Sequence, residues 1–155
     1  MDTTSGTVYK NPATPPENTS QEGKLNNLLE RSNRIIFSTQ TVFPFDFFPD
    51  EITIDETKIQ IIKRTFFYTQ QAFPILIKNI HNISVSSSLV FASVKFEITG
   101  MEENPGEITF LWNSDAYKIK RIITGMTAAV KEGIDLSAVP INELRHKLEE
   151  IGAQR

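Results

Sequence analysis

The chain has 155 residues but no cysteine, only two histidines and no apolar run long enough to cross a bilayer. Without cysteine, disulfide bonds, thiolate catalysis and zinc–thiolate sites are excluded, and a reducing compartment is compatible with the composition. A membrane-spanning helix needs about 20 consecutive apolar residues. Residues 1–6 also lack the basic region and apolar stretch of a secretory signal. We therefore expect a cytoplasmic protein, with contact at the periphery of a membrane as the alternative.

An excess of positive charge is missing as well. Nineteen Asp and Glu residues outnumber sixteen Lys and Arg residues, which gives a formal net charge of −3. Affinity for nucleic acid comes from clustered Lys and Arg, so we do not expect nucleic acid as a partner.

Catalytic and metal-binding motifs are also lacking. His81 and His146 are far apart, and neither is followed by further ligands at a metal-binding spacing. The sequence contains no glycine-rich phosphate loop, no Gly-x-Ser-x-Gly elbow and no His-Glu-x-x-His motif. We predict no enzymatic activity, no metal site and no cofactor.

The N-terminal part differs from the rest in composition. Residues 1–23 are rich in Thr, Ser, Asn, Pro and Gly and offer almost nothing to bury, which predicts a disordered tail. Residues 24–34 are expected to hold a short helix with Leu25, Leu28 and Leu29 on one side. Such a helix needs a surface to lie on, either its own domain or a second copy of the chain.

Residues 35–112 show the alternation of strands. Residues 52–54 and 58–61 flank a hairpin turn at 55–57, and residues 108–112 form a last strand. The clearest strand places one set of apolar side chains on a single face: Val90, Ala92, Val94, Phe96 and Ile98. Short connections predict a mainly antiparallel sheet.

Residues 43–50, with the sequence FPFDFFPD, interrupt this pattern with four phenylalanines and two prolines. Proline removes a donor from the sheet, so we expect an edge or crossover segment. Because large exposed apolar patches are uncommon on monomers, we expect these phenylalanines to belong to the core. An exposed binding patch is the alternative.

A single amphipathic helix is predicted over residues 115–132. Asn113 or Ser114 can cap its start, and Gly133 can end it in a left-handed conformation. We expect Gly125 to mark a close approach to a strand. One apolar stripe should cover the sheet, and it comprises Ile119, Ile122, Ile123, Met126 and Val130.

The order of these segments carries a resemblance. The stretches 51–63, 73–85 and 108–112, followed by the helix, resemble bacterial pleckstrin-homology-like and GRAM-like domains over roughly residues 35–133. The resemblance implies an α+β, mainly β fold. Its centre is a bent antiparallel, partly open barrel of about seven strands, capped by one C-terminal amphipathic helix, with short terminal helices in addition. It also implies a binding module.

Lipid-binding members of this fold carry basic residues around the first hairpin. The candidates here are Lys58, Lys63 and Arg64, but Asp55 and Glu56 make the turn acidic. A carboxylate close to a phosphate site costs Coulomb energy, so we predict no tight binding of phosphoinositides. Recognition of anionic lipid headgroups by these three residues is the alternative function.

Residues 134–155 form a linker followed by a final helix that starts after Pro140. Its apolar stripe includes Leu144, Leu148 and Ile151, which can dock on the domain or bind a partner helix in a weak homodimer. The preferred function is a cytoplasmic protein-interaction scaffold that uses an exposed strand, a groove or this terminal helix.

Overall fold

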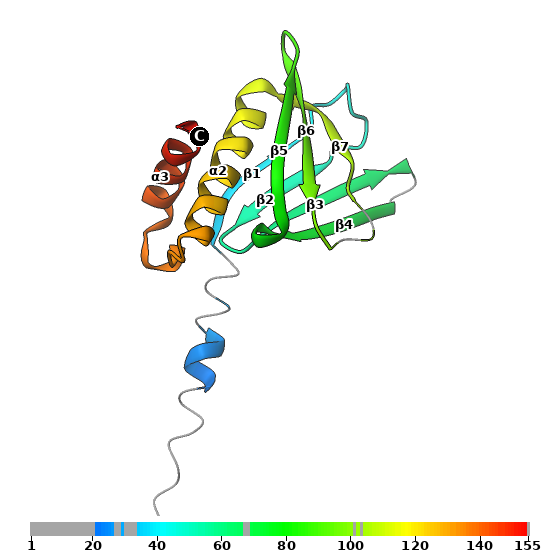
Figure 1. The fold of residues 1–155 in the computed structure, drawn as a ribbon. Helices are drawn as coiled ribbons and strands as arrows, with labels where there is room; N and C mark the ends of the chain where they lie inside the picture. Colours follow the sequence, from blue (N-terminus) through cyan, green and yellow to red (C-terminus); the bar gives the residue numbers. More distant parts are fainter. Residues whose placement is uncertain are drawn as a thin grey trace, which may run out of the picture.

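The computed structural model describes residues 21–26, 29, 34–66, 69–100, 102 and 104–154. Seven antiparallel strands form two sheets, with the orders β1-β2-β3-β4 and β5-β6-β7 (Figure 1). The strands are β1 (Ile35–Gln40), β2 (Glu51–Asp55), β3 (Lys58–Thr65), β4 (Thr69–Leu76), β5 (Ile80–Ser87), β6 (Phe91–Ile98) and β7 (Glu107–Trp112). The helices are α2 (Asn113–Lys131) and α3 (Ile141–Ala153), and the short 3₁₀ turns are η2 (Ile77–Asn79) and η3 (Leu136–Ala138).

The predicted seven strands, their antiparallel pairing and the helical cap are confirmed. In the first hairpin Ile52 pairs with Ile61 and Ile54 with Ile59, on the two sides of the predicted turn. These four side chains are fully buried. Burial of one such side chain contributes about 1.5–3 kcal/mol, so the alternation itself fixes which face of each strand is inside. Val90 is an exception, since it precedes β6 in a hairpin turn and is half exposed.

Helix α2 packs its apolar stripe on the sheets, as predicted for Ile119, Ile122, Ile123 and Met126. The prediction was wrong for Val130, which keeps 43% of its surface exposed. The helix also begins earlier than expected. Trp112 occupies the N-cap position, and no side chain caps the helix.

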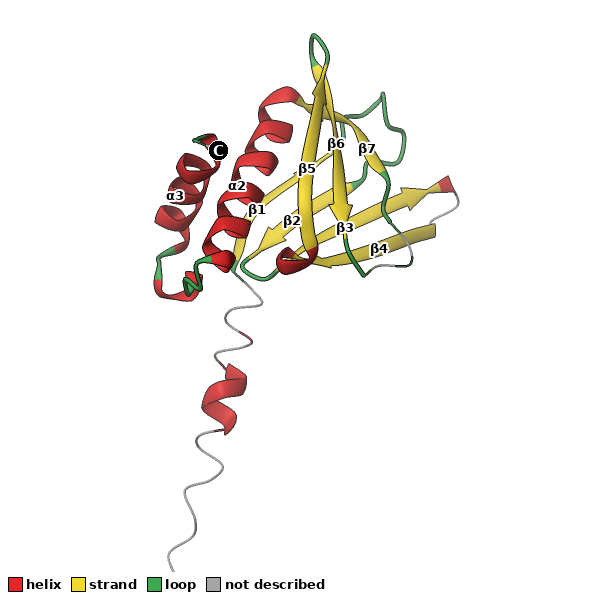
Figure 2. Cartoon of the chain, in the orientation of Figure 1, coloured by secondary structure: helices red, strands yellow, loops and turns green. Residues whose placement is uncertain are grey.

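The predicted final helix docks on the domain, because α3 packs along α2 and both lie on the same side of the sheets (Figure 2). Leu144 and Leu148 are buried in this contact. Gly125 allows the close approach, but its neighbour is α3 and not a strand. A Cβ at this position would collide with the carbonyl oxygen of Leu148. Gly152 of α3 meets the carbonyl oxygen of Arg121 in the same way.

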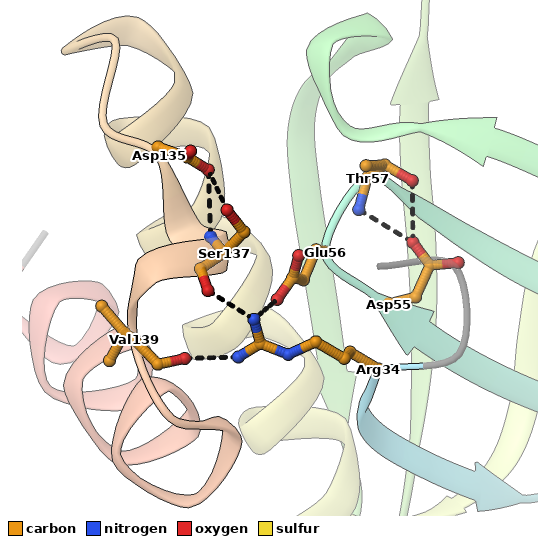
Figure 3. A network of polar contacts seen from close by, with 7 residues as sticks. All are labelled: Arg34, Asp55, Glu56, Thr57, Asp135, Ser137 and Val139. Carbon is orange, nitrogen blue, oxygen red and sulfur yellow. Dashed lines mark hydrogen bonds and ion pairs between the residues drawn. The ribbon is translucent and has the colours of Figure 1, made fainter. Parts of the chain in front are cut away.

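The linker before α3 is held by a buried polar contact, which we call the Arg34 network (Figure 3). The Arg34 guanidinium forms an ion pair with Glu56 at 2.7 Å and donates to the backbone carbonyls of Ser137, at 2.7 Å, and Val139. Asp55 accepts hydrogen bonds from the backbone N–H groups of Thr57 and Lys58, both at 2.8 Å. Asp55 and Glu56 are both buried, so the acidic turn is not exposed to solvent.

Of the predicted N-terminal segments, the structure describes only a part. Residues 21–26 and 29 are helical, and Leu25 and Leu29 are exposed, whereas Leu28 and residues 1–20 lie outside the described residues. Within the part of the chain that the structure describes, no helix has both the length and the apolar character that crossing a membrane requires.

Candidate interaction surface

The loop between β1 and β2, residues 41–50, is built around polar contacts that turn its phenylalanines outward. The buried Thr41 hydroxyl donates to Asp46 at 2.7 Å and accepts from the Asp50 N–H at 2.8 Å. Asp46 also accepts from the Phe48 N–H at 3.1 Å. The Phe43–Pro44 peptide bond is cis. Because the polar side chains form these hydrogen bonds on the inner side of the loop, the apolar side chains lie on its outer side.

The prediction that these phenylalanines belong to the core was wrong. Phe43, Phe45 and Phe47 are 65%, 57% and 72% exposed, and Phe48 is exposed as well. The alternative, an exposed patch, is the arrangement in the structure. The phenylalanine rings are not buried, because the polar side chains of the loop occupy its inner side.

Further aromatic rings from distant segments join this loop. Phe45 lies 4.8 Å from Phe91 and 6.2 Å from Phe110, and Phe91 lies 5.3 Å from Trp112, measured between ring centroids. Phe48 approaches Phe66 of the β3 end at 5.8 Å. We call this set the aromatic surface, and its members are Phe43, Phe45, Phe47, Phe48, Phe66, Phe91, Phe110 and Trp112.

Phe110 reaches this surface through a bulge in β7. Ala92 pairs with Leu111 and Val94 with Ile108, so two residues of β7 stand opposite Ser93 alone. Phe110 adopts a φ of 60°, which is unusual for a bulky residue and costs on the order of 1–3 kcal/mol. Its carbonyl oxygen accepts from the Val42 N–H at 2.9 Å, which joins the loop to the bulge. The bulge turns the ring of Phe110 outward.

Carboxylates lie in and near the loop of the aromatic surface, and the Arg64 guanidinium donates to the Pro49 carbonyl of the same loop at 2.8 Å. Asp46 lies within the loop, Asp50 ends it, and Asp115 accepts from the Thr39 hydroxyl at 2.8 Å near the start of α2. Partial burial raises the pKa of the Asp50 carboxyl above its ordinary value, while the hydrogen bond from the Arg64 N–H opposes the rise. The Asp50 carboxylate at the end of the loop is therefore incompletely solvated.

No family model and no curated protein matches the chain. One solved structure that matches is a DUF1696 family protein with a pleckstrin-homology domain from Shewanella loihica PV-4. The match has 12% sequence identity and a TM-score of 0.41, and it covers 70% of this chain and 92% of the other. At this identity and TM-score the comparison transfers no residue role and no activity to the chain.

The structure does not bring the three predicted lipid-binding residues together. Lys58 begins β3 and Lys63 follows five residues later, a separation of about 16 Å along an extended strand. Lys58 pairs with Asp55 at 3.9 Å, and Arg64 pairs with Glu51 at 3.0 Å. Lys63 donates to the Glu107 carbonyl at 3.5 Å. Each cation thus has a local partner.

Of the three residues predicted to bind a partner helix, two are used within the chain. Helix α2 covers Leu144 and Leu148, and Ile151 alone remains partly exposed. A narrow apolar stripe that is already covered leaves little surface for a helical partner in the folded chain.

Among the described residues, no group of three His, Asp or Glu side chains is arranged to hold a metal ion. His81 and His146 are both exposed, and they lie on different elements, β5 and α3.

Proposed function

We propose that this chain is a non-enzymatic, cytoplasmic protein-interaction module whose contact surface is the aromatic surface. The observation that carries the proposal is the set of ring contacts joining Phe45, Phe91, Phe110 and Trp112, on a loop and a sheet that are far apart in sequence. Phenylalanine and tryptophan are enriched in the cores of protein interfaces, and residues that dominate binding energy cluster in this way.

The backbone supports a binding role for these rings. The chain tolerates a strained conformation at Phe110, which directs an apolar ring toward solvent. Strain of this kind persists only where the surrounding structure imposes it, and it clusters at functional sites. Monomeric proteins rarely expose contiguous apolar patches without a partner.

The charges favour a protein over an anionic membrane as that partner. Lys58, Lys63 and Arg64 are spread along β3 and each has a local acceptor. The loop itself carries Asp46 and Asp50 beside the exposed rings. Carboxylates at this position repel an anionic lipid surface, whose attraction depends on clustered Lys and Arg.

The test is affinity capture from the native cell with the full chain as bait. A Phe45→Ser/Phe47→Ser double variant removes two exposed rings and leaves the core untouched, so it should fold but lose captured protein by about tenfold. Ile134→Ser is the matched control, because Ile134 is 55% exposed but follows the far end of α2.

Vesicle co-sedimentation of the same three proteins completes the test. We expect no binding to vesicles with 30% phosphatidylserine beyond about that of neutral vesicles. The proposal fails if the double variant captures the same proteins as the wild type. It also fails if the rings are required only for vesicle binding.

A further inference from the structure

A cavity of about 270 Å³ lies where α3 packs beside β1 and α2. One aromatic residue and five polar or charged residues line it, and they are Phe37, Lys118, Asn142, Arg145, His146 and Glu149. A cavity of about 150 Å³ holds a benzene molecule, so this one has room for an ionised group together with a small organic part. None of the lining residues belongs to the first hairpin or to the aromatic surface.

Helix α3 lines the cavity with a polar stripe. This stripe recurs at steps of three and four residues, and it comprises Asn142, Arg145, His146 and Glu149. The apolar stripe of α3, with Leu144 and Leu148, is a different one and packs on α2. The polar stripe faces β1, since Phe37 of that strand lines the same cavity.

A bulge in β1 brings Phe37 to the cavity. The register with β2 shifts between Ile35 and Phe37, so Ile36 is an extra residue in the strand. Bulges bend a strand and re-aim its side chains, and they are frequent next to active sites. The Lys118 ammonium lies 5.9 Å from the centre of the Phe37 ring, which attracts the cation to this wall of the cavity.

The positive charge of the cavity comes from Lys118 and Arg145. Within the part of the chain that the structure describes, neither of them takes part in an ion pair. Asp115, one helical turn before Lys118, accepts instead from the Thr39 hydroxyl at 2.8 Å. Glu149, one turn after Arg145, lines the cavity without pairing with it. Two cations at one cavity attract an anion that carries two charges.

The first turn of α3 adds to this attraction. Its N-cap residue, Pro140, forms no side-chain hydrogen bond to the turn. The first N–H groups of a helix have no partner within it, and the positive end of the helix dipole favours anions. Asn142 lies in this turn, and its side-chain amide supplies two further donors. Glu143 of the same turn is not part of the lining and pairs with Lys147 at 3.5 Å.

The order of groups along α3 matches a ligand with two unlike ends. Asn142 and Arg145 are donors at the start of the stripe, and the acceptor Glu149 lies about 10 Å along the axis from Asn142. A phosphate monoester carries about 1.5–2 negative charges at pH 7, close to the combined charge of Lys118 and Arg145. A carboxylate carries only one. The planar guanidinium of arginine also binds two phosphate oxygens at once.

We propose that this cavity binds a phosphate monoester whose organic part carries hydroxyl groups. The phosphate lies between the Lys118 ammonium, the Arg145 guanidinium and the Asn142 amide. A hydroxyl group of the organic part donates to the Glu149 carboxylate. Such an ester occurs as a soluble molecule or as the headgroup of a lipid, and the test separates these sources. The site shares no residue with the aromatic surface and does not depend on its function.

The first test is isothermal titration calorimetry of the full chain with glycerol 3-phosphate at low ionic strength. We expect binding about tenfold tighter than that of succinate, a dicarboxylate of similar size. Arg145→Gln should weaken it by about tenfold or more, because a charge-assisted hydrogen bond is lost. Lys118→Gln should weaken it by about fivefold. Lys120→Gln is the matched control and should bind like the wild type, since Lys120 is an exposed cation of α2 outside the lining.

Glu149→Ala tests the orientation of the ligand. Inorganic phosphate is too short to reach both ends of the stripe, so it should bind the variant about threefold more tightly, because a repelling carboxylate is gone. Glycerol 3-phosphate should not gain in this way, because it also loses the acceptor of its hydroxyl group. An equal gain for the two ligands would overturn the placement of the organic part at Glu149.

Vesicles that contain phosphatidylinositol 4-phosphate, which carries a phosphate monoester and hydroxyl groups, separate the two sources. Binding to glycerol 3-phosphate alone assigns the ligand to a soluble ester. Vesicle binding that Arg145→Gln abolishes assigns it to a lipid headgroup at the same cavity.

Three results overturn the proposal. They are the absence of saturable binding to both probes, equal affinity for succinate and glycerol 3-phosphate, and binding that Lys120→Gln weakens as much as Arg145→Gln does. The three cation variants alter exposed side chains, so the fold is kept. The Phe45→Ser/Phe47→Ser variant should bind glycerol 3-phosphate like the wild type, which distinguishes failure of this site from failure of the aromatic surface.

Discussion

Phe110 shows what one residue contributes to this molecule. Its φ of 60° and its place in the β7 bulge bring its ring beside Phe45 and Phe91. The sequence signal was a plain alternation of Ile108, Phe110 and Trp112, which predicts a regular strand. A bulge depends on which residues stand opposite it in the neighbouring strand, so alternation alone cannot reveal it.

The strained backbone at Phe110 predicts that glycine is more stable than alanine at this position, the reverse of their usual order in a strand. In a regular strand glycine is less stable than alanine by about 0.5–1 kcal/mol, but at positive φ glycine is preferred. We therefore expect the Phe110→Gly variant to be more stable than Phe110→Ala by about 1 kcal/mol in chemical denaturation. Both variants lose the ring, so their difference isolates the backbone. If Phe110→Ala proves the more stable of the two, the left-handed conformation at this position is refuted.

Asp50 gives a prediction on pH at the same scale. Burial raises its pKa above the ordinary value of 3.8, so the folded state binds its proton more tightly than the unfolded state does. The stabilisation from this proton is complete below the unfolded pKa and is lost as pH rises through the folded one. Asp50→Asn keeps an acceptor for the Arg64 N–H but does not titrate. Urea denaturation should show the variant gaining stability relative to wild type between pH 3 and pH 7, and an opposite trend would contradict this.

At the scale of elements, periodicity predicted the strands, the first hairpin and the position of α2 well. These features depend on contacts between near neighbours in sequence and on one buried face. The partner of each face was harder to foresee. The stripe of α3 was compatible with docking or with dimerisation, and the close approach at Gly125 was assigned to a strand. Two helices that cover the same sheet compete for the same apolar surface, and sequence period does not decide between them.

The α2–α3 contact predicts the behaviour of Gly125. In an exposed helix Gly→Ala is stabilising by up to about 1 kcal/mol. Here the added methyl group meets the Leu148 backbone, which cannot move without displacing α3. We expect Gly125→Ala to destabilise by about 1–3 kcal/mol in chemical denaturation. Lys120→Ala on the exposed side should change stability by less than about 0.5 kcal/mol. Stabilisation by Gly125→Ala would mean that the two helices are not in contact.

The Arg34 network predicts how firmly the linker is held. Removing one member of a buried ion pair leaves the other charge without compensation. We expect Arg34→Ala to destabilise by about 2–4 kcal/mol, below the largest known values because Arg34 keeps 23% of its side chain exposed. Glu56→Gln should cost less than Arg34→Ala, because Arg34 retains the Ser137 and Val139 carbonyls. A double-mutant cycle with no coupling between the two positions would show that the ion pair contributes nothing.

At the scale of the whole molecule, the aromatic surface lies on the scaffold that the sequence predicted. The sequence of residues 43–50 favours burial of its phenylalanines over an exposed patch, because apolar side chains are usually buried. The spacing in residues 43–50 did hold a signal. Two prolines and an aspartate among four phenylalanines leave no regular face that an inner sheet could accept. Lys58, Lys63 and Arg64 are close in sequence, but β3 is extended, so Lys58 does not lie beside the other two.

The most direct measurement of the central claim is site-specific photo-crosslinking in the native cell. The photoreactive amino acid p-benzoylphenylalanine replaces Phe47 in one variant and Ile134 in a control, both exposed apolar positions. We predict a small number of discrete protein adducts from position 47 and none of these from position 134. Protein adducts that are equal at the two positions, or adducts to lipid alone at position 47, would contradict the assignment of the aromatic surface as a protein-binding site.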